Sequence, residues 1–138
     1  MREKILGSVI HGLGRGKEFG FPTINIKLID NDLHIKNGVY VVAITICREV
    51  ARNVSTTFNG MLYVGTRPTL DLQEITIEIH ILDFNEDLYN QQISFQILHK
   101  IRDEIRFENV NELIEQLHRD REMVYGYLSS IFFNSSKQ

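Results

Sequence analysis

The feature that most constrains this chain is a run of strict alternation between apolar and polar residues. Residues 75–81 read Ile-Thr-Ile-Glu-Ile-His-Ile. Successive side chains of a β-strand point to opposite faces, so the four isoleucines share one face. Thr76, Glu78 and His80 share the other face. The pattern indicates a strand with one buried face, and Ile93, Phe95 and Ile97 repeat it after a turn.

Other segments have the same character. They are residues 5–11, 24–28, 39–46, 60–65 and 93–98. Residues 39–46 are β-branched and nearly all apolar, which is typical of a strand covered on both faces. Only short turns join the segments, and parallel strands would need crossover helices, so an antiparallel sheet is expected. Six such strands often close into a barrel, and we predict a mainly β fold of this kind.

The end of the chain has a helical pattern instead. Asn109-Val110-Asn111-Glu112 has the spacing of a capping box, with Asn109 as N-cap and Glu112 reaching back to it. Apolar residues then recur at helical spacing to Leu128, interrupted by Asp120 and Arg121. We predict one domain over residues 1–130, with this helix packed on the barrel. Residues 131–138 show no periodicity and are predicted to be a flexible tail.

Composition excludes several classes of protein. The chain has 138 residues, a formal net charge of −3 and 43% hydrophobic residues, so it has no overall basic field to attract nucleic acid or anionic lipid. A single cysteine, Cys47, allows neither an intramolecular disulfide nor a multi-cysteine zinc site. No apolar run approaches the ~20 residues that span a bilayer, and no signal-peptide pattern is present. We expect a cytoplasmic protein without nucleic-acid or membrane partners.

A glycine-rich segment separates the first two predicted strands. It contains Gly12, Gly14, Arg15, Gly16, Lys17 and Gly20. Glycines let the backbone N–H groups approach a phosphate closely, and the two cations add charge. The segment is not a P-loop, because Glu18 follows Lys17. It matches the glycine-rich dinucleotide-binding motif poorly, because Pro22 and a predicted strand follow where that motif requires a helix. A flexible hairpin connection has the same composition, so both interpretations stay open.

Polar residues on the predicted strands are candidates for chemistry. Thr23 and Asn25 lie two apart and share a face, and their oxygens are hard ligands suited to a Mg²⁺ that also binds substrate phosphates. Glu78 could accept a proton from a hydroxyl nucleophile. Arg102 and Phe107 could contact a phosphate and a flat aromatic ring. Ordinary solvent-facing strands and a charged loop would show the same residues.

Taken in order, these segments resemble the riboflavin kinase family from about Gly7 to Asp120. The resemblance rests on residues 14–16 and 20–25, 38–40, 65–69, 77–78 with 82–84, 87–89, 101–102 and Phe107. It implies a six-stranded antiparallel Greek-key barrel with a C-terminal α-helix. It also implies an ATP-dependent kinase that phosphorylates the 5′-hydroxyl of riboflavin, giving FMN and ADP, with Mg²⁺ as the divalent metal.

The resemblance further implies a role for each candidate residue. Glu78 corresponds to the catalytic base, and Thr23 and Asn25 meet the metal and the nucleotide. The nucleotide-binding loop comprises Gly12, Gly14, Arg15, Gly16, Lys17 and Gly20. The flavin-side residues are Arg102, Glu104 and Phe107. The chain departs from the family pattern at Lys17, Ile24 and Tyr63, where arginine, alanine and asparagine are frequent. We expect the Ile24 side chain to point to the face opposite Thr23 and Asn25 and to change the packing there.

Two questions about the whole protein follow from the resemblance. In bacteria this module usually follows a domain that makes FAD from FMN, so an N-terminal FAD synthetase domain is an expected partner in a longer native protein. A monofunctional kinase is the other option. The alternative function is a non-catalytic flavin-binding regulatory or carrier module that has kept the barrel without the chemistry.

Overall fold

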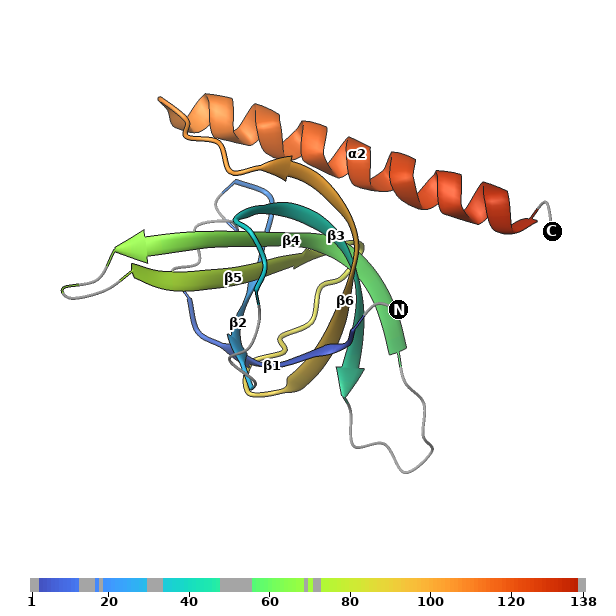
Figure 1. Ribbon diagram of the computed structural model, residues 1–138, viewed down its shortest axis with the longest axis horizontal. Coiled ribbons are helices and arrows are strands. Elements are labelled where there is room, and N and C mark those ends of the chain that lie inside the picture. Colours follow the sequence, from blue (N-terminus) through green and yellow to red (C-terminus); the bar gives the residue numbers. More distant parts are fainter. Residues whose placement is uncertain are drawn as a thin grey trace.

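The strands of the computed structural model close into a barrel (Figure 1), and the structure describes residues 3–12, 17, 19–29, 34–47, 56–68, 70 and 73–136. The strands are β1 (Ile5–Ile10), β2 (Ile24–Leu28), β3 (Gly38–Cys47), β4 (Thr56–Pro68), β5 (Gln73–Ile81) and β6 (Gln92–Asp103). Their order around the barrel is β1-β2-β5-β4-β3-β6, with antiparallel pairing between neighbours. Strands β6, β3, β4 and β5 lie in Greek-key order. The predicted fold is confirmed.

Alternating residues fill the interior of the barrel. Ile77, Ile79 and Ile81 of β5 join the core cluster together with Val42 and Ile44 of β3. Strand β3 is buried on both faces, as predicted, because Val41 points outward into a second apolar cluster that includes residues of the helix. Met61 of β4 belongs to this cluster and Tyr63 of β4 packs against it, so the outer face of β4 is shielded from solvent at these residues.

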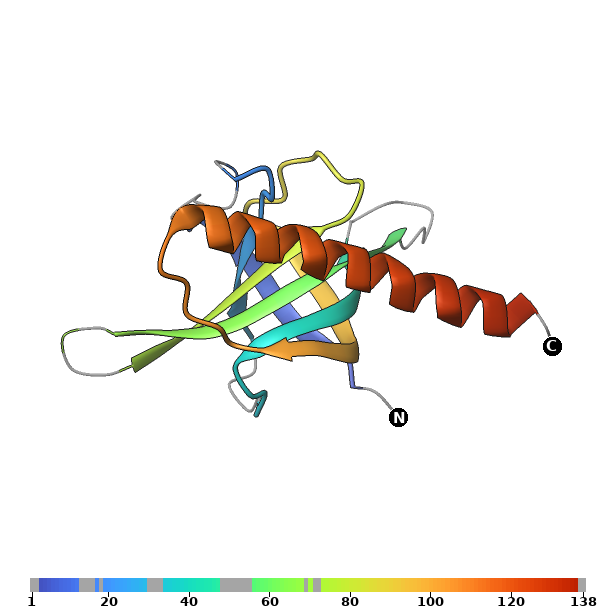
Figure 2. The same cartoon turned by 90° about the horizontal axis from the view of Figure 1, so that it is seen from above.

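Helix α2 (Val110–Ser136) lies across the outside of the barrel (Figures 1 and 2). Leu117 and Val124 anchor it in the second cluster with Phe21 of the segment before β2. The predicted N-cap is confirmed, since the Glu112 N–H donates to Asn109 Oδ1 at 2.9 Å. The Glu112 carboxylate accepts from the Glu108 N–H at 3.3 Å, one residue before the predicted partner.

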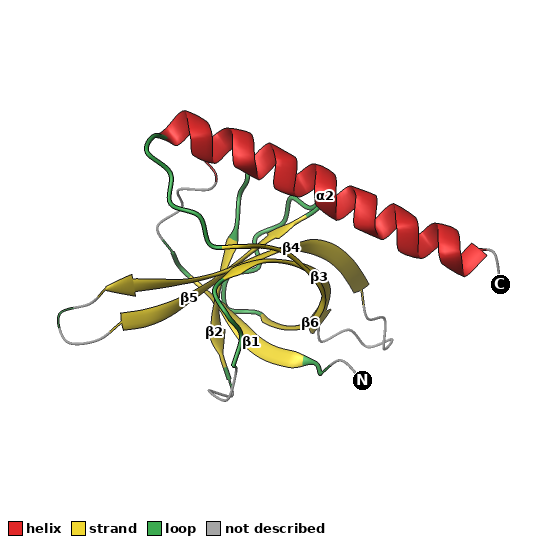
Figure 3. Cartoon of the chain, turned by 45° about the horizontal axis from the view of Figure 1, so that its top comes forward, coloured by secondary structure: helices red, strands yellow, loops and turns green. Residues whose placement is uncertain are grey.

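The helix differs from the sequence-based expectation at its end. It runs to Ser136, so residues 131–136, expected to be a tail, are helical, and this part of α2 extends past the barrel (Figures 2 and 3). No glycine or proline follows Gly126, and an established helix gains one hydrogen bond for each residue it adds. Within the described residues, no helix is long and apolar enough to cross a membrane.

Asp120 also differs from its predicted place. The sequence pattern treats it as an interruption of the apolar stripe, but its side chain is 0% exposed and lies between Leu117 and Val124 on the packed face of α2. A carboxylate can occupy this position because Arg102 of β6 pairs with it. The stripe is therefore continuous, with a charged residue at its centre.

Candidate active site

The pairing of β2 with β5 brings the main candidate residues together. Asn25 is directly opposite Glu78 in the β2–β5 register. The Thr23 hydroxyl, just before β2, donates to Glu78 Oε1 at 3.3 Å across a sequence separation of 55 residues. All three residues are partly buried. An antiparallel pair of strands thus places a hydroxyl, an amide and a carboxylate on one surface.

Strand alternation directs these side chains away from the barrel core. Ile24 lies between Thr23 and Asn25 and packs against the core cluster, so the polar residues on either side point outward. The expected orientation of Ile24, toward the face opposite Thr23 and Asn25, is confirmed, and the residue also lines the first of the cavities described below. Glu78 likewise lies between the core residues Ile77 and Ile79.

Glycines shape the approach to this group. A Cβ atom added at Gly12 would overlap the Asn25 side chain, so only glycine lets the segment that follows β1 pass so close to that amide. Gly20 has a φ of 82°, in the left-handed region that favours glycine, and its N–H donates to the Lys17 carbonyl at 3.3 Å. Lys17 itself is exposed. The predicted loop residues Gly14, Arg15 and Gly16 lie outside the described residues.

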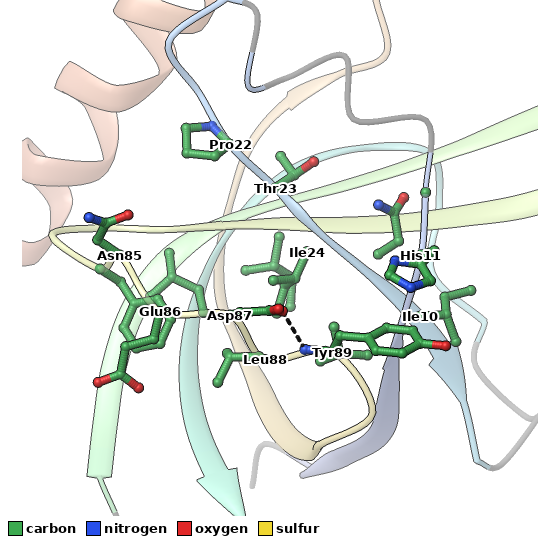
Figure 4. A pocket seen from close by; sticks show the side chains of 16 residues that line it. Ile10, His11, Pro22, Thr23, Ile24, Asn85, Glu86, Asp87, Leu88 and Tyr89 are labelled. Atoms are coloured by element: carbon green, nitrogen blue, oxygen red, sulfur yellow. Dashed lines mark hydrogen bonds between the residues drawn. The ribbon is translucent and has the colours of Figure 1, made fainter.

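A cavity of about 310 Å³ lies beside Gly12, Thr23 and Asn25, and we call it the Tyr89 cavity. Figure 4 shows the rings of His11 and Tyr89 face to face in its wall, with centroids 3.6 Å apart. Asp87 Oδ1 accepts from the Tyr89 N–H at 2.9 Å and orders the turn that presents the ring. Sequence reasoning assigned no role to these residues, although residues 87–89 contributed to the resemblance.

A second cavity, of about 290 Å³, also borders the group, and we call it the Phe107 cavity. Glu78 lines it together with Arg102, Glu104 and Phe107, the predicted flavin-side residues. A third space of about 780 Å³ borders both Asn25 and Glu78. The polar group therefore borders both smaller cavities, since Thr23 and Asn25 line the Tyr89 cavity and Glu78 lines the Phe107 cavity.

The wall of the Phe107 cavity is held by an ion pair. Arg102 Nε and Nη2 each donate to the Asp120 carboxylate at 2.9 Å, and Gln116 donates to the same carboxylate at 2.9 Å. The Arg102 guanidinium lies 5.9 Å from the centre of the Phe107 ring. Glu104 accepts from the Asn37 side-chain amide at 3.0 Å. Arg102 thus lines the cavity with its orientation fixed by the helix.

Tyr63 lies opposite Glu78 on β4 and also lines the Phe107 cavity. Burial raises the pKa of its phenol well above the ordinary value, and the nearby Asp120 carboxylate raises it further. The hydroxyl donates only weakly, to Met61 Sδ at 3.7 Å. At neutral pH the residue is therefore an uncharged apolar wall with a hydroxyl tip.

The side-chain oxygens at this site determine which kind of metal ion it suits. Within the described part of the chain, no group of three or more His, Cys, Asp or Glu side chains could hold a metal ion. Thr23, Asn25 and Glu78 offer a hydroxyl, an amide and a carboxylate oxygen instead. Such a set suits a hard cation that keeps several waters and takes further oxygens from a substrate phosphate.

Comparison with known proteins identifies relatives of the whole barrel. The family model described as riboflavin kinase matches residues 2–128. A bifunctional riboflavin kinase/FMN adenylyltransferase of Haemophilus influenzae is 36% identical over 127 residues, covering 92% of this chain and 39% of that protein. The chain thus spans about two-fifths of that relative's length.

Solved structures agree on the fold. A protein from Streptococcus pneumoniae described as a macrolide-efflux protein matches with a TM-score of 0.78 and 35% identity, covering 88% of this chain and 38% of that one. Riboflavin kinase from Trypanosoma brucei matches with a TM-score of 0.67 and 24% identity, covering 91% of this chain and 79% of that one. The latter similarity concerns the fold alone.

Proposed function

Since the chain belongs to the riboflavin kinase family, we propose that it transfers the γ-phosphate of ATP to the 5′-hydroxyl of riboflavin, giving FMN and ADP. One observation carries the proposal. Thr23, Asn25 and Glu78 form a single polar group that lines two cavities, Thr23 and Asn25 one of them and Glu78 the other. A phosphoryl transfer needs this layout, because donor and acceptor must approach from opposite sides of the transferred group.

The two substrates are assigned to the cavities by chemistry. The nucleotide occupies the Tyr89 cavity, where Thr23 and Asn25 face its phosphates and the exposed Tyr89 ring offers a flat surface to the base. The flavin occupies the Phe107 cavity, where Phe107 supplies an aromatic face and Arg102 and Glu104 supply polar groups. Glu78 then stands beside the flavin's reactive hydroxyl.

The chemical step uses Glu78 as the general base. The riboflavin 5′-oxygen attacks the γ-phosphorus, and its proton passes to the Glu78 carboxylate. The bond from the γ-phosphorus to the β,γ-bridging oxygen breaks, and its electron pair leaves with ADP. The Thr23 hydroxyl donates to the Glu78 carboxylate at 3.3 Å, so it orients the base before substrate binds. Positioning and proton transfer are the main contributions of the protein.

A divalent metal fits this arrangement. Thr23 and Asn25 would hold Mg²⁺ through their side-chain oxygens, with the remaining ligands supplied by water and nucleotide phosphate. When bound, the metal neutralises charge on the phosphates. The absence of a multi-carboxylate cluster among the described residues agrees with a metal that arrives with its nucleotide.

The test is to incubate the protein with riboflavin, ATP and Mg²⁺ and to separate the flavins by chromatography. We expect FMN to accumulate with an equal amount of ADP. Glu78→Gln should lower kcat by about 100-fold or more, because general-base catalysis contributes 10²–10⁴-fold, while the Kd for riboflavin stays nearly constant. Glu122→Gln, an exposed glutamate on α2, is the matched control and should retain full activity.

The alternative function has a different signature in the same experiment. A flavin-binding regulatory or carrier module would quench riboflavin fluorescence but return the flavin unchanged, without ADP release. Unchanged turnover in Glu78→Gln would instead refute only the role of that carboxylate. An FMN adenylyltransferase or FAD synthetase activity belongs to the longer relatives, and a domain of that kind remains a proposed partner of this one.

A further inference from the structure

We propose that His80 is a positioning residue that holds the Pro22–Thr23 backbone where Thr23 can reach Glu78. The inference rests on the proposed function, since it concerns the same polar group. His80 lies on β5 two residues after Glu78, on the same outward face, yet it is only 8% exposed. It has no place in the chemical step, so its burial and its bonding need another explanation.

The hydrogen bond of His80 defines its protonation. Its Nδ1 atom lies 2.8 Å from the Pro22 carbonyl oxygen. A carbonyl oxygen only accepts, so Nδ1 carries the proton and donates. Burial lowers the pKa of His80, and the nearby Arg121 guanidinium lowers it further against the opposing effect of the Pro22 bond. His80 is therefore a neutral imidazole at pH 7 with one assigned tautomer.

The bond lies where the backbone pairing of β2 with β5 ends. The β2–β5 ladder pairs Ile24 with Ile79 and Asn25 with Glu78. Extension of that register toward the residues before β2 would place Thr23 opposite His80 and Pro22 opposite Ile81, but the paired residues end at Ile24, and Pro22 has no N–H to donate to a ladder. The His80 side chain supplies a donor to Pro22 at the point where the backbone pairing ends. The chain entering β2 is thereby tied to β5.

Phe21 secures the same entry from the other side. Its ring is 1% exposed and meets the edge of His80 at a centroid distance of 5.4 Å. From helix α2, His118 contacts that ring at 5.0 Å and the Arg121 guanidinium lies 4.7 Å from its centre. The two residues before Thr23 are thus held between β5 and α2, which leaves Thr23 and Asn25 little freedom to move away from Glu78.

Paired substitutions separate positioning from simple filling of space. His80→Phe keeps an aromatic ring against Phe21 but removes the donor to Pro22. His80→Asn retains an N–H donor at the same number of bonds from Cβ as Nδ1. We expect His80→Phe to lower kcat by about 10- to 100-fold, the scale of a misplacement near 1 Å, and His80→Asn to recover most of that loss. The KM for riboflavin should change little in either variant.

Hydrogen exchange gives a readout that does not depend on activity. Peptides covering residues 19–28 should exchange faster in His80→Phe than in the wild type, and His80→Asn should be intermediate. His99→Phe is the control, because His99 is an exposed histidine that stacks on Tyr127, far from this segment in the sequence and on β6. It should alter neither exchange in residues 19–28 nor turnover.

The outcomes distinguish this inference from the function itself. A wild type that forms no FMN would refute the proposed kinase, while faster exchange in His80→Phe would still support the positioning role. Equal exchange and equal kcat in wild type and His80→Phe would overturn the inference. A ¹⁵N NMR spectrum of the wild type that places the imidazole proton on Nε2 would overturn it without any variant.

Discussion

Replacing Asp120 with asparagine should lower the free energy of unfolding by about 3 kcal/mol, within the 3–5 kcal/mol typical of breaking a buried ion pair. Asp120 is 0% exposed and the Arg102 side chain is 14% exposed, so water can do little to compensate. Asparagine keeps one oxygen acceptor and loses the second charged bond, which contributes about 1.5–3 kcal/mol. The rest of the cost comes from leaving the Arg102 guanidinium without a counter-charge.

The measurement is urea unfolding followed by circular dichroism, with the slope m checked for constancy. For a chain of this length, a loss of 3 kcal/mol corresponds to a fall in Tm of roughly 10 °C. Glu115→Gln is the matched control, since it breaks an exposed pair with Arg119 at 3.7 Å and should cost less than about 0.5 kcal/mol. Riboflavin affinity should also fall in Asp120→Asn, because Arg102 lines the Phe107 cavity.

A second substitution tests the physical reason. Arg102→Met in the Asp120→Asn background removes the unpaired charge, so the double variant should be no less stable than the single one. A loss below about 1 kcal/mol in Asp120→Asn would refute the reasoning, because the bridge would then behave like a surface pair. A double variant much less stable than Asp120→Asn would show that Arg102 acts mainly through its packing.

Three further outcomes follow from the structure. Gly12→Ala should displace the Asn25 side chain and weaken Mg-ADP binding in calorimetry, with riboflavin affinity unchanged; equal Mg-ADP affinity would contradict the close approach. Gly126→Ala, in open space on α2, should raise stability by about 0.5–1 kcal/mol in thermal unfolding. Burial holds the pKa of His80 below its unfolded value, so unfolding takes up a proton between the two values and stability rises with pH there. The contribution of His80 to the free energy of unfolding should be complete above about pH 6.5 and be lost as the pH falls through the folded-state pKa. In His80→Asn the free energy of unfolding should depend less on pH over this range. The charges of Asp83 and Arg121 also act on that ring, and Glu78 lies two residues before it on β5. The measurement is therefore the difference in pH dependence between the wild type and His80→Asn.

Local sequence predicted most of the barrel correctly. The alternation in residues 75–81 placed three isoleucines in the core, and the apolar run at residues 39–46 predicted a strand buried on both faces. Asn109 was recognisable as an N-cap. These features depend on periodicity and on short-range hydrogen bonds, which a few neighbouring residues are enough to specify.

The candidate site was predicted less completely. The shared face of Thr23 and Asn25 follows from their spacing of two, but their contact with Glu78 depends on the pairing of β2 with β5. The roles of His80 and Asp120 were not predicted, because each depends on a partner in a different element. A histidine on a polar strand face and an aspartate in a helical stripe look unremarkable until the fold supplies Pro22 and Arg102.

Periodicity along the chain was enough to identify the period-two strands, the start of the helix and the polar residues that are candidates for oxygen ligands and for a base. The contacts between distant residues depend on the folded arrangement of the strands and the helix: Thr23 meets Glu78, His80 meets Pro22, and Asp120 meets Arg102. The two kinds of feature differ in how far apart in sequence the interacting residues lie. Strand and helix patterns arise from neighbours along the chain, whereas strand register and the packing of α2 are set by the burial of side chains that are distant in sequence.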